Sequence, residues 1–153
     1  ISESTLDPME KRKLVTAITN KHDIAQVQIT IDAEDTRNQI LLYQLTINDI
    51  SIDMINFFKD NKVFTIDSNK VCELKCILDD LEINYEIQEN CSMITILGYK
   101  IHGVPGVMAR IATTLSNNKI TILQSSDSHT TISCLVDTND ALKGVKVLHK
   151  EFM

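Results

Sequence analysis

Residues that break regular structure are scarce in this sequence. Its 153 residues include four glycines and two prolines, and three of the glycines and one proline fall between residues 98 and 106. A chain with so few breakers elsewhere can form long helices and strands. The segment 98–106 is therefore the strongest local signal in the sequence.

Several other features are missing. No apolar run approaches the roughly 20 residues that a membrane-spanning helix needs, and no signal peptide opens the chain. There is no tryptophan, aromatic residues make up 5% of the chain, and 21 acidic residues outnumber 15 basic ones. Binding to nucleic acid or to a membrane surface is therefore disfavoured. Because the first residue is isoleucine and not methionine, we expect a piece of a longer protein.

The four cysteines lack the spacing of a metal site or a redox motif. Cys72, Cys76, Cys91 and Cys134 form no C-x-x-C pair, and no pattern of His, Cys and Asp suggests a metal ion. We therefore expect free thiols in a reducing cytoplasm and no bound metal.

Hydrophobic periodicity predicts alternating strands and helices in the first half of the chain. Ser68 is placed to cap a helix. The expected elements are a strand at 13–19, a strand at 24–31, a helix at 34–47, strands at 50–57 and 63–66, a helix after 68 and a strand at 85–87.

The same order is then repeated. A shift of 70 residues superposes segment 48–52 on segment 118–122, which indicates an internal repeat. The expected elements of the second copy are a strand at 93–97, a helix beginning at Pro105, a strand at 120–124, a polar bend at 125–128, a strand at 131–136, and a last helix capped by Asp137 or Thr138.

Each copy has the order of a ferredoxin-like βαββαβ unit. The second copy lacks its last strand, whereas the strand at 13–19 stands unassigned before the first copy. We therefore predict an α+β fold in which the first copy is inserted into the second, with antiparallel sheets and helices on one face. The first module then spans 22–89, and the second combines 12–21 with 90–153, so that the leading strand completes its sheet.

The segments 103–111 and 118–132 resemble an ACT domain, and more narrowly the second ACT module in the C-terminal regulatory half of bacterial aspartokinases. The segments 25–29 and 50–56 resemble the first ACT module of the same enzymes, and the ending 148–152 is also similar to theirs. Members of this family likewise nest one ACT module in the other.

The resemblance implies a parent enzyme that transfers phosphate from ATP to the β-carboxylate of aspartate, the first step toward lysine, threonine, methionine and diaminopimelate. No Gly-rich phosphate loop is present in this chain, so we expect it to be non-catalytic, with ATP and Mg²⁺ bound by a separate kinase domain. The resemblance further implies feedback inhibition by lysine, threonine or meso-diaminopimelate, a cytoplasmic location and a homodimer formed through the ACT modules.

The glycine-containing loop is the first candidate effector site. Glycines allow the backbone to approach a small ligand, and the N-terminus of the following helix can hold a carboxylate. The segment that ends the next strand could bind an α-ammonium group. The alternatives are a tight strand-to-helix connection and a serine-rich bend that bind nothing. The candidate residues are His102, Gly103, Val104, Pro105, Gly106, Val107, Gln124, Ser125 and Ser126.

In the first module, the resemblance points to Ser51, Ile52 and Asp53 as effector-binding residues. The preceding loop, 33–37, departs from the family pattern because it has no glycine, and its Glu34 and Asp35 would repel a carboxylate. Either the ligand binds at the second module or the first module serves only packing.

Two other classes of function share parts of this pattern. A free-standing pair of ACT modules could sense an amino acid for another protein. An RNA-recognition module has the same element order, but the strands at 63–66 and 131–135 lack its aromatic motif.

Overall fold

A computed structural model describes residues 15–98, 101 and 104–153. The chain divides into two compact units, which we call the first module, Asp23–Cys91, and the second module, which combines the residues up to His22 with Ser92–Met153. Within the described residues, no helix is both long and apolar enough to cross a membrane.

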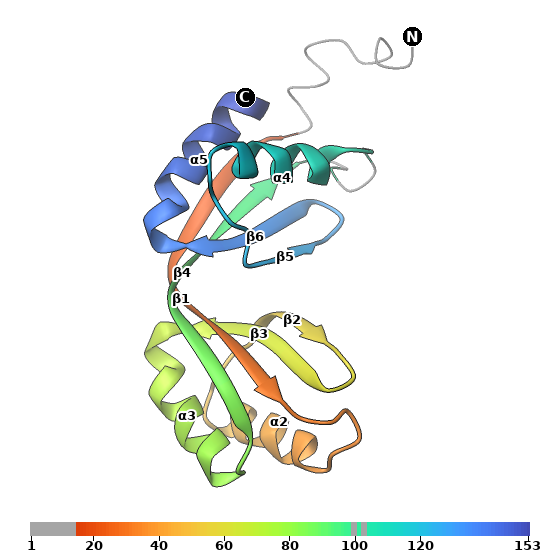
Figure 1. The fold of residues 1–153 in the computed structure, drawn as a ribbon, viewed down its shortest axis with the longest axis vertical. Coiled ribbons are helices and arrows are strands. Elements are labelled where there is room, and N and C mark those ends of the chain that lie inside the picture. Colours follow the sequence, from red (N-terminus) through yellow and green to blue (C-terminus); the bar gives the residue numbers. More distant parts are fainter. Residues whose placement is uncertain (1–14, 99–100, 102–103) are drawn as a thin grey trace. The chain divides into compact units, whose positions relative to one another are not determined.

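The first module contains two helices and four paired strand segments (Figure 1). The strand order is β2-β3-β1-β4, and β3 is antiparallel to both β1 and β2. Its elements are β1 (Ala17–Thr30), α2 (Arg37–Ile47), β2 (Asp53–Phe57), β3 (Asn61–Asp67), the 3₁₀ turn η2 (Ser68–Lys70), α3 (Val71–Asp80) and β4 (Asn84–Leu97). The pairing of β2 with β3 is irregular between Asp53 and Asn56, where Met54 has a φ of 47°.

The second module uses the other ends of the two long strands. Its strand order is β1-β4-β6-β5, completed by α4 (Val107–Asn117), β5 (Gln124–Asp127), β6 (Thr131–Asp137) and α5 (Thr138–Phe152). Val15 is buried in its core, and the Thr16 N–H donates to the Leu97 carbonyl at 2.8 Å. The leading segment therefore completes the second module, which confirms that the first is inserted into it. Residues 13 and 14 of the predicted strand lie outside the described residues.

Four predicted strands are in fact two. The segments 13–19 and 24–31 belong to the single strand β1, and 85–87 and 93–97 belong to β4. The polar residues between them resemble turns in the sequence. In the structure they continue the strands, and Asp23 (φ 62°) and Asn90 (φ 59°) adopt the left-handed conformation that Asp and Asn tolerate best.

Other boundaries also differ from the prediction. The strand expected at 120–124 is β5 at Gln124–Asp127, so the predicted bend at 125–128 is largely strand, paired from Gln124 with Leu135 onward. The strand expected at 50–57 begins at Asp53. The helix expected from Pro105 begins at Val107. Ser68 opens a 3₁₀ turn and does not cap α3, whose N-cap residue is Lys70. The predicted cap at Asp137 is confirmed, since its carboxylate accepts from the Asn139 N–H at 2.9 Å.

Each module has its own apolar core. In the first, Val27 and Ile29 of β1 pack with Phe64 and with Leu74 and Leu78 of α3. In the second, the core includes Ile94, Ile96, Ile111, Leu115, Cys134 and Leu148. Gly144 of α5 lies so close to β4 that an added Cβ would meet Ile94 Cδ1 at 2.7 Å. Close approach of helix and sheet therefore depends on this glycine.

Candidate effector site

The loop before α4 ends in a left-handed glycine. Gly106 is the N-cap of α4 and has a φ of 83°, and the Arg110 N–H donates to its carbonyl at 2.9 Å. A glycine cap has no side chain to accept the amide hydrogens of the first turn, and this turn contains no acidic residue. Pro105 and Gly106 are exposed, whereas Val107 is buried in the core. His102 and Gly103 lie outside the described residues.

One of the predicted segments, at Ser125 and Ser126, lines a hollow in the second module. The hollow has a volume of about 180 Å³ and is lined by Met108, Ser125, Ser126, Asp127 and Ile132. Ser125 and Ser126 are exposed on β5, while Gln124 is buried. The structure thus brings β5 close to the first turn of α4. Polar groups of β5 and an uncapped helix start form a setting that suits a small zwitterion.

In the first module, the residues predicted to bind the effector have structural roles in the structure. Asp53 Oδ1 accepts from the Met54 N–H at 2.9 Å, and its carbonyl accepts from Thr65 Oγ1 at 3.1 Å. Ile52 packs against the core, and Ser51 is exposed before β2 begins. These residues stabilise the irregular start of β2.

The loop before α2 is closed by its own side chains. Asp35 Oδ1 accepts from the Arg37 N–H at 2.8 Å, and Asp35 Oδ2 accepts from Arg37 Nη2 at 2.7 Å. The hydrogen bonds from the Arg37 side chain lower the pKa of Asp35 below its ordinary value and raise that of Arg37. The sequence predicted that Asp35 would repel a carboxylate; it did not reveal that Asp35 accepts from the backbone and the side chain of Arg37.

Comparisons with known proteins identify the fold. Residues 86–150 match the ACT domain family. The chain is 34% identical to aspartokinase 1 of Bacillus subtilis over 141 residues, which cover 92% of this chain and 35% of that protein. The family match lies mainly in the second module. The chain spans about a third of the length of the curated relatives it matches.

Solved structures show the same nested ACT fold. The regulatory subunit of aspartate kinase from Thermus thermophilus has a TM-score of 0.83 at 20% identity, covering 92% of this chain and 100% of that one. Aspartokinase III of E. coli, in complex with lysine and aspartate, has a TM-score of 0.74 at 17% identity, covering 92% of this chain and 33% of that one. At these identities the likeness shows the fold alone.

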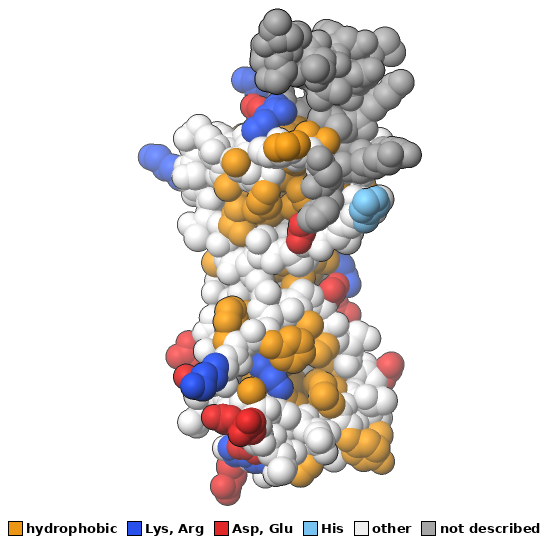
Figure 2. All heavy atoms as spheres, turned by 90° about the vertical axis from the view of Figure 1, so that its right-hand side faces the viewer, with side chains coloured by type: hydrophobic (Ala, Val, Ile, Leu, Met, Phe, Trp, Pro, Cys, Tyr) orange, Lys and Arg blue, Asp and Glu red, His pale blue; other side chains and the backbone are white. Residues whose placement is uncertain are grey.

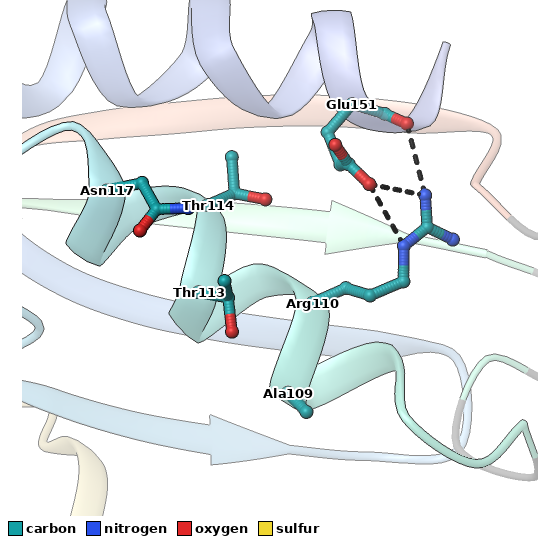
Figure 3. Close-up of a pocket in the computed structure, with 6 residues that line it drawn as sticks. All are labelled: Ala109, Arg110, Thr113, Thr114, Asn117 and Glu151. Carbon is teal, nitrogen blue, oxygen red and sulfur yellow. Dashed lines mark hydrogen bonds and ion pairs between the residues drawn. The ribbon is translucent and has the colours of Figure 1, made fainter.

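A polar groove lies between α4 and α5 of the second ACT module (Figure 3). Arg110 reaches toward Glu151, with Nη2 at 2.6 Å and Nε at 3.0 Å from Oε2, and its guanidinium lies 4.5 Å from the centre of the Phe152 ring. One hollow of the groove has a volume of about 260 Å³ and is lined by Ala109, Arg110, Thr113, Thr114, Asn117 and Glu151. This ion pair joins residues 41 positions apart, so no local sequence pattern could have indicated it. Its role here is to hold the end of α5 against α4.

The first ACT module exposes apolar side chains on α2. Ile40, Tyr43 and Ile47 recur at helical spacing and are 47%, 64% and 56% exposed. Phe57 at the end of β2 and Phe58 are also exposed. Figure 2 shows hydrophobic side chains gathered on the visible face of this module, in the lower half of the view. Exposed apolar side chains that gather on one face are typical of a protein–protein interface.

In the described part of the chain, no group of three or more His, Cys, Asp or Glu side chains could hold a metal ion. The described cysteines are free thiols, exposed at positions 72 and 76 and buried at positions 91 and 134.

Proposed function

We propose that this chain is the allosteric regulatory region of an aspartate kinase. The observation that supports this most strongly is the 34% identity to aspartokinase 1 over 92% of the chain, together with the nested ACT fold. In the whole enzyme, a kinase domain would transfer phosphate from ATP, with Mg²⁺, to the β-carboxylate of aspartate. The residues of this chain would supply the sensing site and no catalytic group.

The proposed effector is an end-product amino acid bound at the hollow of the second module. Its carboxylate would lie at the start of α4, where Gly106 leaves the first turn without a side-chain cap. The hydroxyls of Ser125 and Ser126 and the carboxylate of Asp127 would accept hydrogen bonds from the α-ammonium group. Lysine, threonine and meso-diaminopimelate share this head group, and the E. coli neighbour was solved with lysine and aspartate.

Ligand-induced stabilisation tests this proposal. At a concentration near 100 times its dissociation constant, the effector should raise the free energy of unfolding by about 2.7 kcal/mol. Ser126→Lys should weaken this effect because it adds a positive charge where the α-ammonium group of the ligand is proposed to bind. Ser116→Lys, on an exposed position of α4 outside the hollow, is the matched control and should respond like the unmodified chain. Equal responses of the two variants, or none with any of the three amino acids, would contradict the proposed site.

We further propose that two copies of the chain associate through the first module. Strand β2 stands at the end of the strand order, so a second copy can extend the sheet with backbone hydrogen bonds. The apolar positions Ile40, Tyr43 and Ile47 of α2 and Phe57 of β2 would be covered in the same contact. Effector binding would then be coupled to the kinase domains through the geometry of this dimer.

Sedimentation of charge variants tests the dimer. Tyr43→Glu should shift the chain toward the monomer, because a buried carboxylate without a partner opposes association. Leu142→Glu is the matched control, since Leu142 on α5 is 63% exposed and Tyr43 is 64% exposed. A dimer that is weakened equally by both variants, or only by Leu142→Glu, would place the interface elsewhere.

A separate regulatory polypeptide is the second arrangement to test. It is supported by the regulatory subunit from Thermus thermophilus, whose whole chain is covered by this one. In that case the ACT pair would bind a separate kinase subunit. Copurification of a full-length kinase with the tagged chain, reversed by the effector, would favour this arrangement over a single polypeptide.

A further inference from the structure

The connection between β1 and α2 in the first module uses almost all of its own hydrogen-bond donors. A bound carboxylate would need backbone N–H groups at the start of the helix. Here six of these groups already donate to acceptors in the same module: those of Ala33, Glu34, Asp35, Arg37, Asn38 and Gln39. This segment therefore has little left to offer an incoming anion.

The carboxylate of Asp35 is held at the start of α2. It accepts from the Arg37 backbone N–H at 2.8 Å, as a helix-capping carboxylate does, and both of its oxygens accept from the Arg37 side chain at 2.7–3.1 Å. The pair is a forked ion pair of the kind that Arg forms with bound carboxylates. Asp35 thus reproduces, within the chain, the contacts of an amino-acid carboxyl group.

Neighbouring groups fix this arrangement. Arg37 Nη1 donates to the carbonyls of Leu81 and Glu82, both at 3.0 Å, which follow the last turn of α3. The buried Asn38 amide donates to the carbonyls of Asp32 and Asp35, both at 2.9 Å. Lys62 in turn donates to Asn38 Oδ1. The loop is held from several sides and cannot open without breaking these contacts.

The second module differs at the corresponding place. Its helix α4 begins at a glycine in the left-handed conformation, with no side-chain hydrogen bond at the cap position. The two modules share a fold, but one helix start is capped by a carboxylate and the other is not. The two modules therefore differ in whether the start of the helix can accept a ligand carboxylate.

We propose that Asp35 is a built-in carboxylate that closes the first module to amino acids, so that each chain binds one effector molecule, at the second module. This inference rests on the proposed effector function and specifies which module performs it. Removing the Asp35 carboxylate should allow the backbone N–H groups at the start of α2 and the Arg37 side chain to bind an anion.

Two measurements test this inference on the intact chain. In the first, inorganic sulfate is titrated into the unmodified chain, Asp35→Gly and Glu89→Gln, and amide chemical shifts are followed by NMR. Glycine is a tolerated helix cap, so Asp35→Gly should remain folded. Glu89→Gln removes one negative charge from an exposed position of the same module and controls for net charge. Sulfate should bind at residues 35–38 of Asp35→Gly about tenfold more tightly than in the other two chains, the effect of one charge-assisted hydrogen bond.

In the second measurement, lysine, threonine and meso-diaminopimelate are titrated calorimetrically into the unmodified chain. The expected stoichiometry is one molecule per chain, with amide shifts at 104–109 and 124–127 and none at 33–39. Two molecules per chain, or shifts at 33–39, would overturn the inference, as would sulfate binding at 35–38 that is equal in all three chains. If none of the amino acids binds, the proposed function fails, while the sulfate titration still decides whether Asp35 closes the first module.

Discussion

Substitutions of Gly106 should be destabilising through the backbone alone. An added Cβ would meet no atom within 4 Å, but the φ of 83° is one that residues with L side chains rarely adopt. We therefore expect alanine to lower the free energy of unfolding by about 1 kcal/mol and valine by about 2 kcal/mol, the range for a left-handed residue. Asparagine, which tolerates this conformation, should cost least.

Urea unfolding of the second module measures these differences. With a slope of about 2 kcal/mol per molar urea, the midpoint should fall by about 0.5 M for Gly106→Ala and about 1 M for Gly106→Val. If the four proteins unfolded at the same urea concentration, or if asparagine were as destabilising as valine, the left-handed conformation would not be the source of the cost.

The same series separates stability from sensing. Gly106→Val should abolish the stabilisation by effector, because a β-branched residue moves the start of α4 away from the left-handed geometry. Gly106→Asn should keep most of it. A valine variant that still responds fully to effector would contradict the placement of the carboxylate at this loop.

Three further predictions concern packing, thiols and pH. Gly144→Ala gains about 1 kcal/mol of helix propensity, but it places a Cβ 2.7 Å from Ile94 Cδ1. Ile94→Val removes that Cδ1 and should therefore rescue the alanine variant, with a coupling of about 1 kcal/mol in a double-mutant cycle. Additive effects of the two substitutions would contradict the contact. A disulfide reagent should react rapidly with the exposed Cys72 and Cys76, and with the buried Cys91 and Cys134 only when the chain unfolds. Burial also raises the pKa of Cys134 to about 11, which disfavours its reactive thiolate. Rapid reaction of all four thiols would contradict the packing. Arg37 lowers the pKa of Asp35, so the unmodified chain should be more stable than Asp35→Asn at pH values above the ordinary pKa of 3.8. This difference in the free energy of unfolding should disappear as the pH falls below that value. A difference that persists in acid would contradict the pairing.

The nested fold could be predicted because it follows from the number and order of the expected strands. The repeat at a shift of 70 residues and the missing last strand of the second copy required the leading segment to pair there. Thr16 does so through its bond to Leu97, next to the buried Val15. The continuity of β1 and β4 could not be predicted in this way. Asp23 and Asn90 are residues typical of turns, and only pairing with neighbouring strands keeps them in extended segments.

The candidate site was predictable only in part. Glycine content and a polar strand end indicated Gly106, Ser125 and Ser126, and the latter two line one hollow with Met108. The positions in the first module required knowledge of side-chain partners. Asp53 accepts from the backbone N–H of Met54 and Asp35 pairs with Arg37, and charge signs alone do not reveal such pairing. Contacts between distant residues, such as Arg110 with Glu151, depend on how helices pack.

The route of β1 and β4 through both modules makes the second module a domain interrupted within a hairpin. His22 and Ser92, where the interruption begins and ends, are joined by a hydrogen bond of 2.8 Å between Nδ1 and Oγ, and Ser92 Oγ is in turn 2.9 Å from Thr138 Oγ1. Neighbouring antiparallel strands with such close ends can be connected by a two-residue Asn-Gly turn. Replacing 23–91 by that turn would give a protein of a little over half the length that retains an uninterrupted core. No single cut of the chain would release either module intact.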